Sequence, residues 1–239
     1  MHKIVVGWMY PNLLNLHGER GSVQKLVQVG AQLGVEVEIR RIEDFDDPID
    51  FEALDMLIFL PGEITEFQYL VPALEKQRQA LDAYLEKGGY LLAIGTSGLM
   101  FGTSVEREDG SIQEGLKYLD MTAKERKYVW GDDLHVCLAD GQELIGSQIM
   151  MADVQAQAPL AKVLYGRGNN GTGGDGARYR NLIYTNCLGP LYVKNPWLAE
   201  NIIRDICQTR GIEITGEADH KIARDSFAST LRFIQKKMQ

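Results

Sequence analysis

The sequence predicts an α/β fold in which helices cover a mostly parallel sheet. Two observations support this. Short apolar runs alternate with amphipathic stretches over the first hundred residues, and those stretches are long enough for helical crossovers between parallel strands. With 239 residues, 45% of them hydrophobic, the chain can bury a sizeable core. A single domain spanning residues 1–239 is the simplest organisation.

The expected elements of the first half are defined by apolar spacing, which has a period near 3.6 in helices and near 2 in half-buried strands. In chain order they are a strand at 3–9, a helix at 22–33, strands at 35–39 and 56–60, one helix from about 70 to 87, and a strand at 90–94. Glycines follow the second helix and the last strand, where turns are needed.

The second half contains mainly strand-like segments, which either extend the sheet or form an antiparallel lobe on it. These segments are 134–138, 144–150, 160–166 and 181–187. Two helices close the chain. The first begins at about residue 195 and carries Cys207 on its apolar stripe, and the second runs from about 219 to 237. We expect these helices to pack as the C-terminal part of the same domain.

Composition excludes several classes of function. The formal charge is −8 and the pI is near 5.1, which argues against nucleic-acid binding, because that activity needs a basic footprint. No run approaches the roughly 18 apolar residues of a membrane span, and the start does not resemble a secretory signal. Three widely spaced cysteines fit a reduced cytoplasm, and the four scattered histidines do not match a metal site. We expect no cofactor.

Ligands of open parallel sheets bind at the carboxyl ends of the strands. Four segments are expected there, namely 10–21, 61–68, 95–98 and 188–196. The glycine-rich segment 166–176 lacks the Gly-Lys-Ser/Thr of a phosphate loop, and we interpret it as a flexible hairpin loop.

The segment Gly95-Thr96-Ser97-Gly98 follows a strand as a nucleophile elbow would. Ser97 has Gly95 two residues before it, but Leu99 stands where the second glycine of that pattern belongs. The favoured interpretation is therefore a glycine-rich turn that caps a helix through Thr96 or Ser97.

The run from Tyr10 to Ser22, Tyr-Pro-Asn-Leu-Leu-Asn-Leu-His-Gly-Glu-Arg-Gly-Ser, resembles the opening of a known family. This family is the CobB/CobQ-like class I glutamine amidotransferases, and the resemblance is greatest to the amidotransferase subunits of lipid II isoglutaminyl synthase (GatD). The motif positions kept here are Tyr10, Asn12, Asn15, Gly18 and Gly21. Two later segments, 166–170 and 189–196, also resemble family motifs, so the likeness spans nearly the whole chain. It implies a flavodoxin-like or Rossmann-like three-layer fold.

Members of this family hydrolyse glutamine and pass ammonia to a Mur-ligase-like, ATP-dependent partner (MurT), which amidates a cell-wall precursor. The resemblance leaves a cobalamin-like pathway open. Hydrolysis needs a cysteine thiolate, a histidine base and backbone N–H groups for the oxyanion. In this sequence Gly95 occupies the cysteine position and Leu188 the histidine position. The family's oxyanion loop keeps only Gly62 and Gln68 here, and its substrate-binding arginine falls on Tyr128.

These differences predict a degenerate amidotransferase, a non-catalytic or regulatory cytoplasmic subunit of a Mur-ligase-like amidating complex. Its vestigial pocket would be lined by Gly62, Gln68, Thr96, Ser97, Tyr128, Gly189 and Pro190. One alternative is a hydrolase with relocated groups, Ser97 or Cys187 as nucleophile and His17 or His135 as base. Another is a sensor that binds a small molecule in the vacated pocket.

Overall fold

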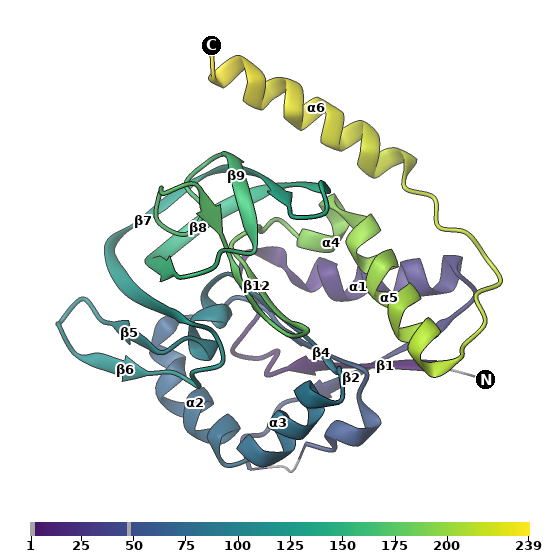
Figure 1. Ribbon diagram of the computed structural model, residues 1–239, viewed down its shortest axis with the longest axis horizontal. Helices are drawn as coiled ribbons and strands as arrows, with labels where there is room; N and C mark the ends of the chain where they lie inside the picture. The colour runs from purple at the N-terminus through teal and green to yellow at the C-terminus, as the bar shows by residue number, and fades with distance from the viewer. Residues whose placement is uncertain (1–2, 47–48) are drawn as a thin grey trace.

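The computed structural model describes residues 3–46 and 49–239 and contains two six-stranded sheets (Figure 1). The first sheet has the strand order β11-β12-β4-β3-β1-β2. Its strands are β1 (Lys3–Met9), β2 (Glu36–Ile42), β3 (Met56–Phe59), β4 (Tyr90–Ile94), β11 (Ala177–Tyr179) and β12 (Leu182–Thr185). Only β11 pairs antiparallel with its neighbour in this sheet, which confirms the predicted mostly parallel arrangement.

Helices cover both faces of the first sheet. Successive side chains of a strand point to opposite faces, so Ile4 of β1 belongs to one buried cluster and Val5 to another. The cluster with Ile4 includes apolar residues of α1 (Arg20–Gln32), α4 (Leu191–Lys194) and α5 (Pro196–Arg210). The cluster with Val5 includes those of α2 (Phe67–Glu75) and α3 (Arg78–Glu86). The first sheet is thus the middle layer of three.

The second sheet is built around two long strands, β7 (Met121–Leu138) and β8 (Glu143–Ala156), which pair antiparallel. Its other strands are β5 (Ser104–Glu106), β6 (Ile112–Glu114), β9 (Ala161–Tyr165) and β10 (Gly174–Asp175). The pairing register shifts between Glu125 and Trp130, so β7 is bulged there. The predicted antiparallel lobe is therefore present, although the 181–187 segment became β12 and joined the first sheet in parallel.

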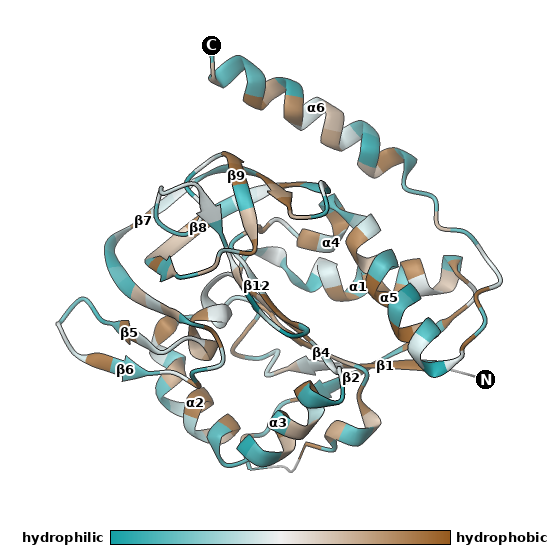
Figure 2. Cartoon of the chain, in the orientation of Figure 1, coloured by the Kyte–Doolittle hydropathy of each residue, from teal (hydrophilic) through white to brown (hydrophobic). Residues whose placement is uncertain are grey.

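Short 3₁₀ helices connect several of these elements. They are η1 (Leu16–Gly18), η2 (Phe51–Ala53), η3 (Ile64–Glu66) and η4 (Gly95–Phe101). The C-terminal helix α6 (Lys221–Lys237) lies along the outside of the molecule beside the second sheet (Figure 1). Its Phe227 ring packs edge-on against Trp197 of α5, with ring centroids 5.6 Å apart. Figure 2 shows hydrophobic residues on the strands of the first sheet, whereas α6 alternates between hydrophilic and hydrophobic residues.

One local prediction was wrong. The single helix expected from about 70 to 87 is two helices, α2 and α3, because Gln77 leaves the helical conformation (φ −110°, ψ 16°). Its side chain accepts a hydrogen bond from the Ile49 backbone N–H at 2.8 Å. The apolar stripe continues across this break, since Leu74 and Leu81 are seven residues apart and both are buried. Periodicity alone therefore could not detect the interruption.

The 166–176 segment connects β9 to β10, which pair antiparallel, so the predicted hairpin loop is present. It is held in place by side chains, which its glycine content did not indicate. The Gln148 side chain of β8 accepts hydrogen bonds from the backbone N–H groups of Arg167 (3.2 Å) and Gly168 (3.1 Å). The Asn169 side chain bonds both the N–H and the carbonyl of Gly176 (2.8 and 3.0 Å). These buried polar contacts fix the loop onto the second sheet.

Within residues 3–46 and 49–239, we find no helix long and apolar enough to cross a membrane.

Candidate functional site

The residue after β4, Gly95, forms a sharp turn at the carboxyl end of the first sheet. Its φ is +62°, a left-handed conformation that L side chains rarely adopt. A Cβ atom placed on Gly95 would lie 3.2 Å from Cδ2 of Leu188 and 3.3 Å from Cγ of Pro61. The two positions that the family likeness assigns to nucleophile and base therefore face each other. The space at Gly95 is filled by the hydrocarbon side chains of Leu188, which is fully buried, and Pro61.

The neighbouring loop carries Gly62, whose backbone N–H is the retained candidate for an oxyanion donor. This N–H donates to the Thr96 hydroxyl at 3.0 Å, and the same hydroxyl donates to the Gly62 carbonyl at 2.5 Å. Leu14 packs directly against the glycine, because a Cβ on Gly62 would lie 2.5 Å from Leu14 Cδ2. The N–H is therefore engaged within the protein. Thr96 ties two loops together and does not cap η4, contrary to our expectation.

Ser97 is buried next to this turn and bonds only backbone carbonyls in the described contacts. Its Oγ lies 2.9 Å from the Phe59 carbonyl and 3.0 Å from the Ile94 carbonyl. A serine becomes a nucleophile when a base takes its proton. In this position the hydroxyl proton points to a carbonyl, so Ser97 acts as a tie between β3 and β4. It does not cap η4 either.

Cys187 precedes Leu188 and is completely enclosed. Burial raises the pKa of the Cys187 thiol well above its ordinary value, and the nearby carboxyl groups of Asp175 and Glu19 raise it further. Since the thiolate is the reactive form, this environment opposes nucleophilic chemistry.

The two histidines considered as bases lie in different surroundings. His17 in η1 is half-buried with φ +60°, and burial lowers its pKa while the charge of Glu63 raises it. His135 of β7 is buried, and its Nε2 lies 2.9 Å from Glu143 Oε2. Its ring packs edge-on against Phe227 of α6. None of the contacts described for either histidine joins it to Ser97 or Cys187.

Of the remaining residues of the expected pocket, some lie beside Leu188 and others lie on exposed positions. Gly189 (φ +104°) and Pro190 lie beside Leu188 at the start of α4. Gln68 in α2 is exposed and donates to the Thr65 carbonyl at 3.0 Å. Tyr128 lies on the bulged stretch of β7, 74% exposed, with the Lys127 ammonium over its ring. An exposed tyrosine carries no positive charge to hold a substrate carboxylate, so it does not replace the arginine that the family likeness implies there.

The retained opening motif contains a residue that sequence reasoning missed, Glu19. Its buried carboxylate accepts hydrogen bonds from the backbone N–H groups of Gly189 and Leu191 and from the Ser22 hydroxyl. Burial raises the pKa of Glu19, and these hydrogen bonds act against the rise. The carboxylate therefore fastens the 10–21 segment to the start of α4. No local pattern reveals this contact, because the partners are about 170 residues apart.

Other positions of the opening motif are structural as well. A Cβ on Gly21 would lie 2.7 Å from Pro190 Cγ, so only glycine permits this approach. Tyr10 is buried at the end of β1, and burial raises its pKa to about 12. Asn12 accepts from Arg41 at 3.3 Å. Asn15 precedes η1 and Gly18 is its last residue; both are exposed, and Gly18 has φ +73°.

A second buried polar group is centred on Asp175 and contacts the chain just before Leu188, through Thr185 and Asn186. Its carboxylate accepts from the Thr185 hydroxyl at 2.7 Å and from the Asn186 side chain at 2.9 Å. Asn186 also donates to Asn169 at 3.1 Å, which connects the network to the 166–170 motif. Burial raises the pKa of Asp175. Within the described residues, no group of three or more His, Cys, Asp or Glu side chains could hold a metal ion.

Comparisons of sequence and of structure both find glutamine-hydrolysing proteins similar to this chain. No protein-family model matches the chain. It is 26% identical over 211 residues to the lipid II isoglutaminyl synthase (glutamine-hydrolyzing) subunit GatD of Streptococcus pneumoniae, covering 84% of this chain and 80% of that one. It is 24% identical over 226 residues to the GatD subunit of Staphylococcus aureus, covering 92% and 93%.

Solved structures show the same fold at lower identity. A glutamine amidotransferase crystal structure gives a TM-score of 0.53 at 14% identity, covering 84% of this chain and 98% of that one. The glutaminase domain of Trypanosoma brucei CTPS gives 0.52 at 8% identity, covering 90% and 97%. The chain is thus similar in sequence to the GatD subunits of lipid II isoglutaminyl synthase and has the fold of the glutamine amidotransferases.

Proposed function

We propose that this chain is a GatD-like amidotransferase subunit that has lost the glutaminase reaction and serves a Mur-ligase-like, ATP-dependent partner as a non-catalytic or regulatory subunit. The observation that carries the proposal is the pair Gly95 and Leu188. They face each other at the carboxyl end of the sheet, where the family likeness assigns the cysteine and the histidine.

Each chemical requirement of glutamine hydrolysis fails separately in this arrangement. Gly95 has no side chain to form a thioester, and Leu188 has no lone pair to accept a proton. The Gly62 N–H already donates to Thr96, so it is not directed at a developing oxyanion. Loss of the nucleophile alone lowers rates by several orders of magnitude, and the three losses together support a subunit without this activity.

The parts of the family sequence that are retained support a scaffold role. Glu19 and Gly21 hold the opening segment against the start of α4, and Asn169 and Asp175 hold the 166–176 loop. These contacts maintain the loops at the carboxyl end of the first sheet without supplying a reactive group. They therefore support a subunit that keeps the loop scaffold of the family without its reaction.

The partner is inferred from the relatives, both of which are described as subunits of lipid II isoglutaminyl synthase. By this analogy the ligase is MurT-like, the substrate is the lipid-linked cell-wall precursor, and the complex works in the cytoplasm on ammonia from another source. We infer a single domain over residues 1–239, with α5 and α6 as its C-terminal part.

The two alternative functions receive less support. Ser97 and Cys187 are both buried, and no described contact places a base beside either of them. A sensor that uses the vacated pocket would need open space at Gly95, yet Leu188 and Pro61 fill that space.

The proposal is tested by measuring ammonia and glutamate release from glutamine, with the chain alone and with the Mur-ligase-like protein of the same organism. We expect no glutamine-dependent release in either case, and co-purification of the two proteins when they are produced together. Turnover that is lost on Ser97→Ala or Cys187→Ala substitution would overturn the non-catalytic role. Failure to co-purify would overturn the subunit role.

A further inference from the structure

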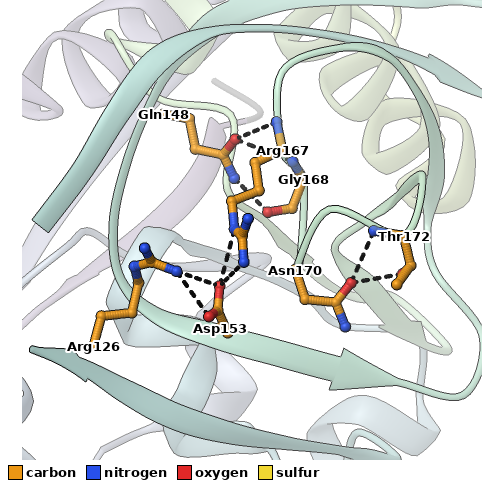
Figure 3. Close-up of polar contacts among 7 residues, drawn as sticks. All are labelled: Arg126, Gln148, Asp153, Arg167, Gly168, Asn170 and Thr172. Carbon is orange, nitrogen blue, oxygen red and sulfur yellow. Dashed lines mark hydrogen bonds and ion pairs between the residues drawn. The ribbon is translucent and has the colours of Figure 1, made fainter. Parts of the chain in front are cut away.

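Two arginines converge on one carboxylate of the second sheet (Figure 3). Arg126 of β7 donates through Nη1 to both oxygens of Asp153 at 2.9 and 2.8 Å. Arg167, from the loop after β9, places Nε and Nη2 each 3.0 Å from Asp153 Oδ1. A single aspartate thus receives two guanidinium groups.

This arrangement leaves one positive charge and several N–H donors without an acceptor. Arg126 Nε is buried and has no hydrogen-bond partner among the described residues. The side chains remain partly open, with exposures of 24% for Arg126, 32% for Arg167 and 34% for Asp153. By contrast, Arg107, directly after β5, pairs one-to-one with Glu125 of β7 at 2.8 Å. The Asp153 cluster therefore carries an excess positive charge that the Arg107–Glu125 pair does not.

The cluster is separate from the Gly95–Leu188 position. Ala152 and Val154, which flank Asp153 on β8, are buried in the core cluster that contains Phe101 of η4. Because side chains alternate along a strand, Asp153 points to the opposite face. An activity at this cluster would not use the vestigial reaction centre.

A groove of about 390 Å³ lies beside the cluster. Its lining includes Asp153, the neutralised ion pair of Lys124 with Glu106 (2.7 Å), and the uncharged polar residues Ser104, Thr122, Gln155 and Asn170. The side-chain oxygen Oδ1 of Asn170 accepts hydrogen bonds from the Thr172 backbone N–H (3.1 Å) and hydroxyl (2.6 Å). Among the described residues its side-chain amide nitrogen donates no hydrogen bond, so it is a further donor at the edge of the groove.

We propose that Arg126 and Arg167 form a binding site for the carboxylate of a small acid or peptide, whose polar body lies in the adjoining groove. A guanidinium group binds a carboxylate through two parallel N–H···O bonds. The excess charge of +1 matches a singly charged carboxylate better than a phosphate dianion. This inference does not depend on the proposed function, and each can fail without the other.

The test uses N-acetyl-dialanine, a peptide with one carboxylate, titrated into the full-length protein at constant ionic strength and followed by NMR. We expect saturable shifts of the Arg126 and Arg167 side-chain N–H signals. The uncharged methyl ester of the same peptide should give none. Arg126→Gln and Arg167→Gln should each weaken binding about tenfold or more, because each removes a charged hydrogen-bond partner. Arg107→Gln should leave it unchanged.

Asp153→Asn provides a result that a merely structural cluster would not give. Removing the competing carboxylate frees both guanidinium groups, so the peptide should bind about threefold tighter or more. Thermal unfolding checks that each variant is folded. The proposal is overturned if wild-type protein does not bind the peptide, if the methyl ester binds equally well, or if inorganic phosphate binds and the peptide does not. Equal affinity in both folded arginine variants would also overturn it.

Discussion

The Glu19 carboxylate accepts a hydrogen bond from the Leu191 backbone N–H at 3.1 Å and so joins the end of the first loop to the start of α4. We expect Glu19→Gln to lower the free energy of unfolding by about 1–3 kcal/mol, because the amide nitrogen cannot accept and one buried N–H loses its partner. Urea unfolding at pH 7 measures this loss. The exposed Glu36→Gln should change stability by less than about 0.5 kcal/mol. Equal effects of both substitutions would contradict the role of Glu19.

Much of the fold was predictable because it depends on local spacing. The alternation of apolar runs and amphipathic stretches located β1, β3, β4 and α1 within a few residues. The opposed positions of Gly95 and Leu188 followed from the family likeness. Their packing against each other could not be predicted, because it depends on how η4 and the segment before α4 meet.

The ties that set the geometry of the candidate site were not predictable. Thr96 and Gly62 are 34 residues apart, and Asn169 and Asn186 are 17 apart. A threonine or asparagine in a loop has many possible partners, and the sequence does not show which one tertiary packing brings near. For the same reason, the glycine content of 166–176 suggested flexibility, although buried side chains hold that loop in place.

The contact between Gly95 and Leu188 can be tested by a double-mutant cycle. Gly95→Ala should destabilise the protein by about 1–2 kcal/mol from its positive φ alone, and more because the new methyl group meets Leu188. Leu188→Ala should cost about 2–5 kcal/mol as a buried truncation. Combined, the two should cost less than their sum by at least about 0.5 kcal/mol, because the truncation makes room for the methyl group.

Gly211 supplies the matched control for this cycle. Its φ is +64°, and a Cβ there would meet nothing within 4 Å. Gly211→Ala should therefore show only the backbone cost and should be additive with Leu188→Ala. Additivity of the Gly95 pair as well, measured by urea unfolding, would show that Leu188 does not fill the space at the turn.

The three thiols should differ sharply in reactivity. Burial raises the pKa of Cys187 well above its ordinary value and also raises that of Cys207, whereas Cys137 is partly exposed. Iodoacetamide at pH 8 should therefore modify Cys137 first in the native protein and all three cysteines after unfolding in urea. Peptide mapping by mass spectrometry gives the sites. Rapid native modification of Cys187, or an adduct there with an electrophilic glutamine analogue, would favour a relocated nucleophile.

Asp175 should make the stability depend on pH in an unusual direction. Burial raises the pKa of Asp175 in the folded state. The carboxyl of the unfolded chain titrates near pH 4. Between pH 4 and the raised folded pKa, the native protein therefore binds the proton more tightly than the unfolded chain does. Stability from this group is then greatest below that interval and falls as the pH rises through it, by at most about 1.4 kcal/mol per pH unit. Asp175→Asn should remove this fall, which urea unfolding at pH 4, 5, 6 and 7 would reveal.

Asp109→Asn is the control, because hydrogen bonds from Ser111 lower the pKa of that exposed carboxyl and move its effect on stability below pH 4. Parallel pH profiles for wild type and Asp175→Asn would mean that Asp175 is not titrating in the folded protein over this range.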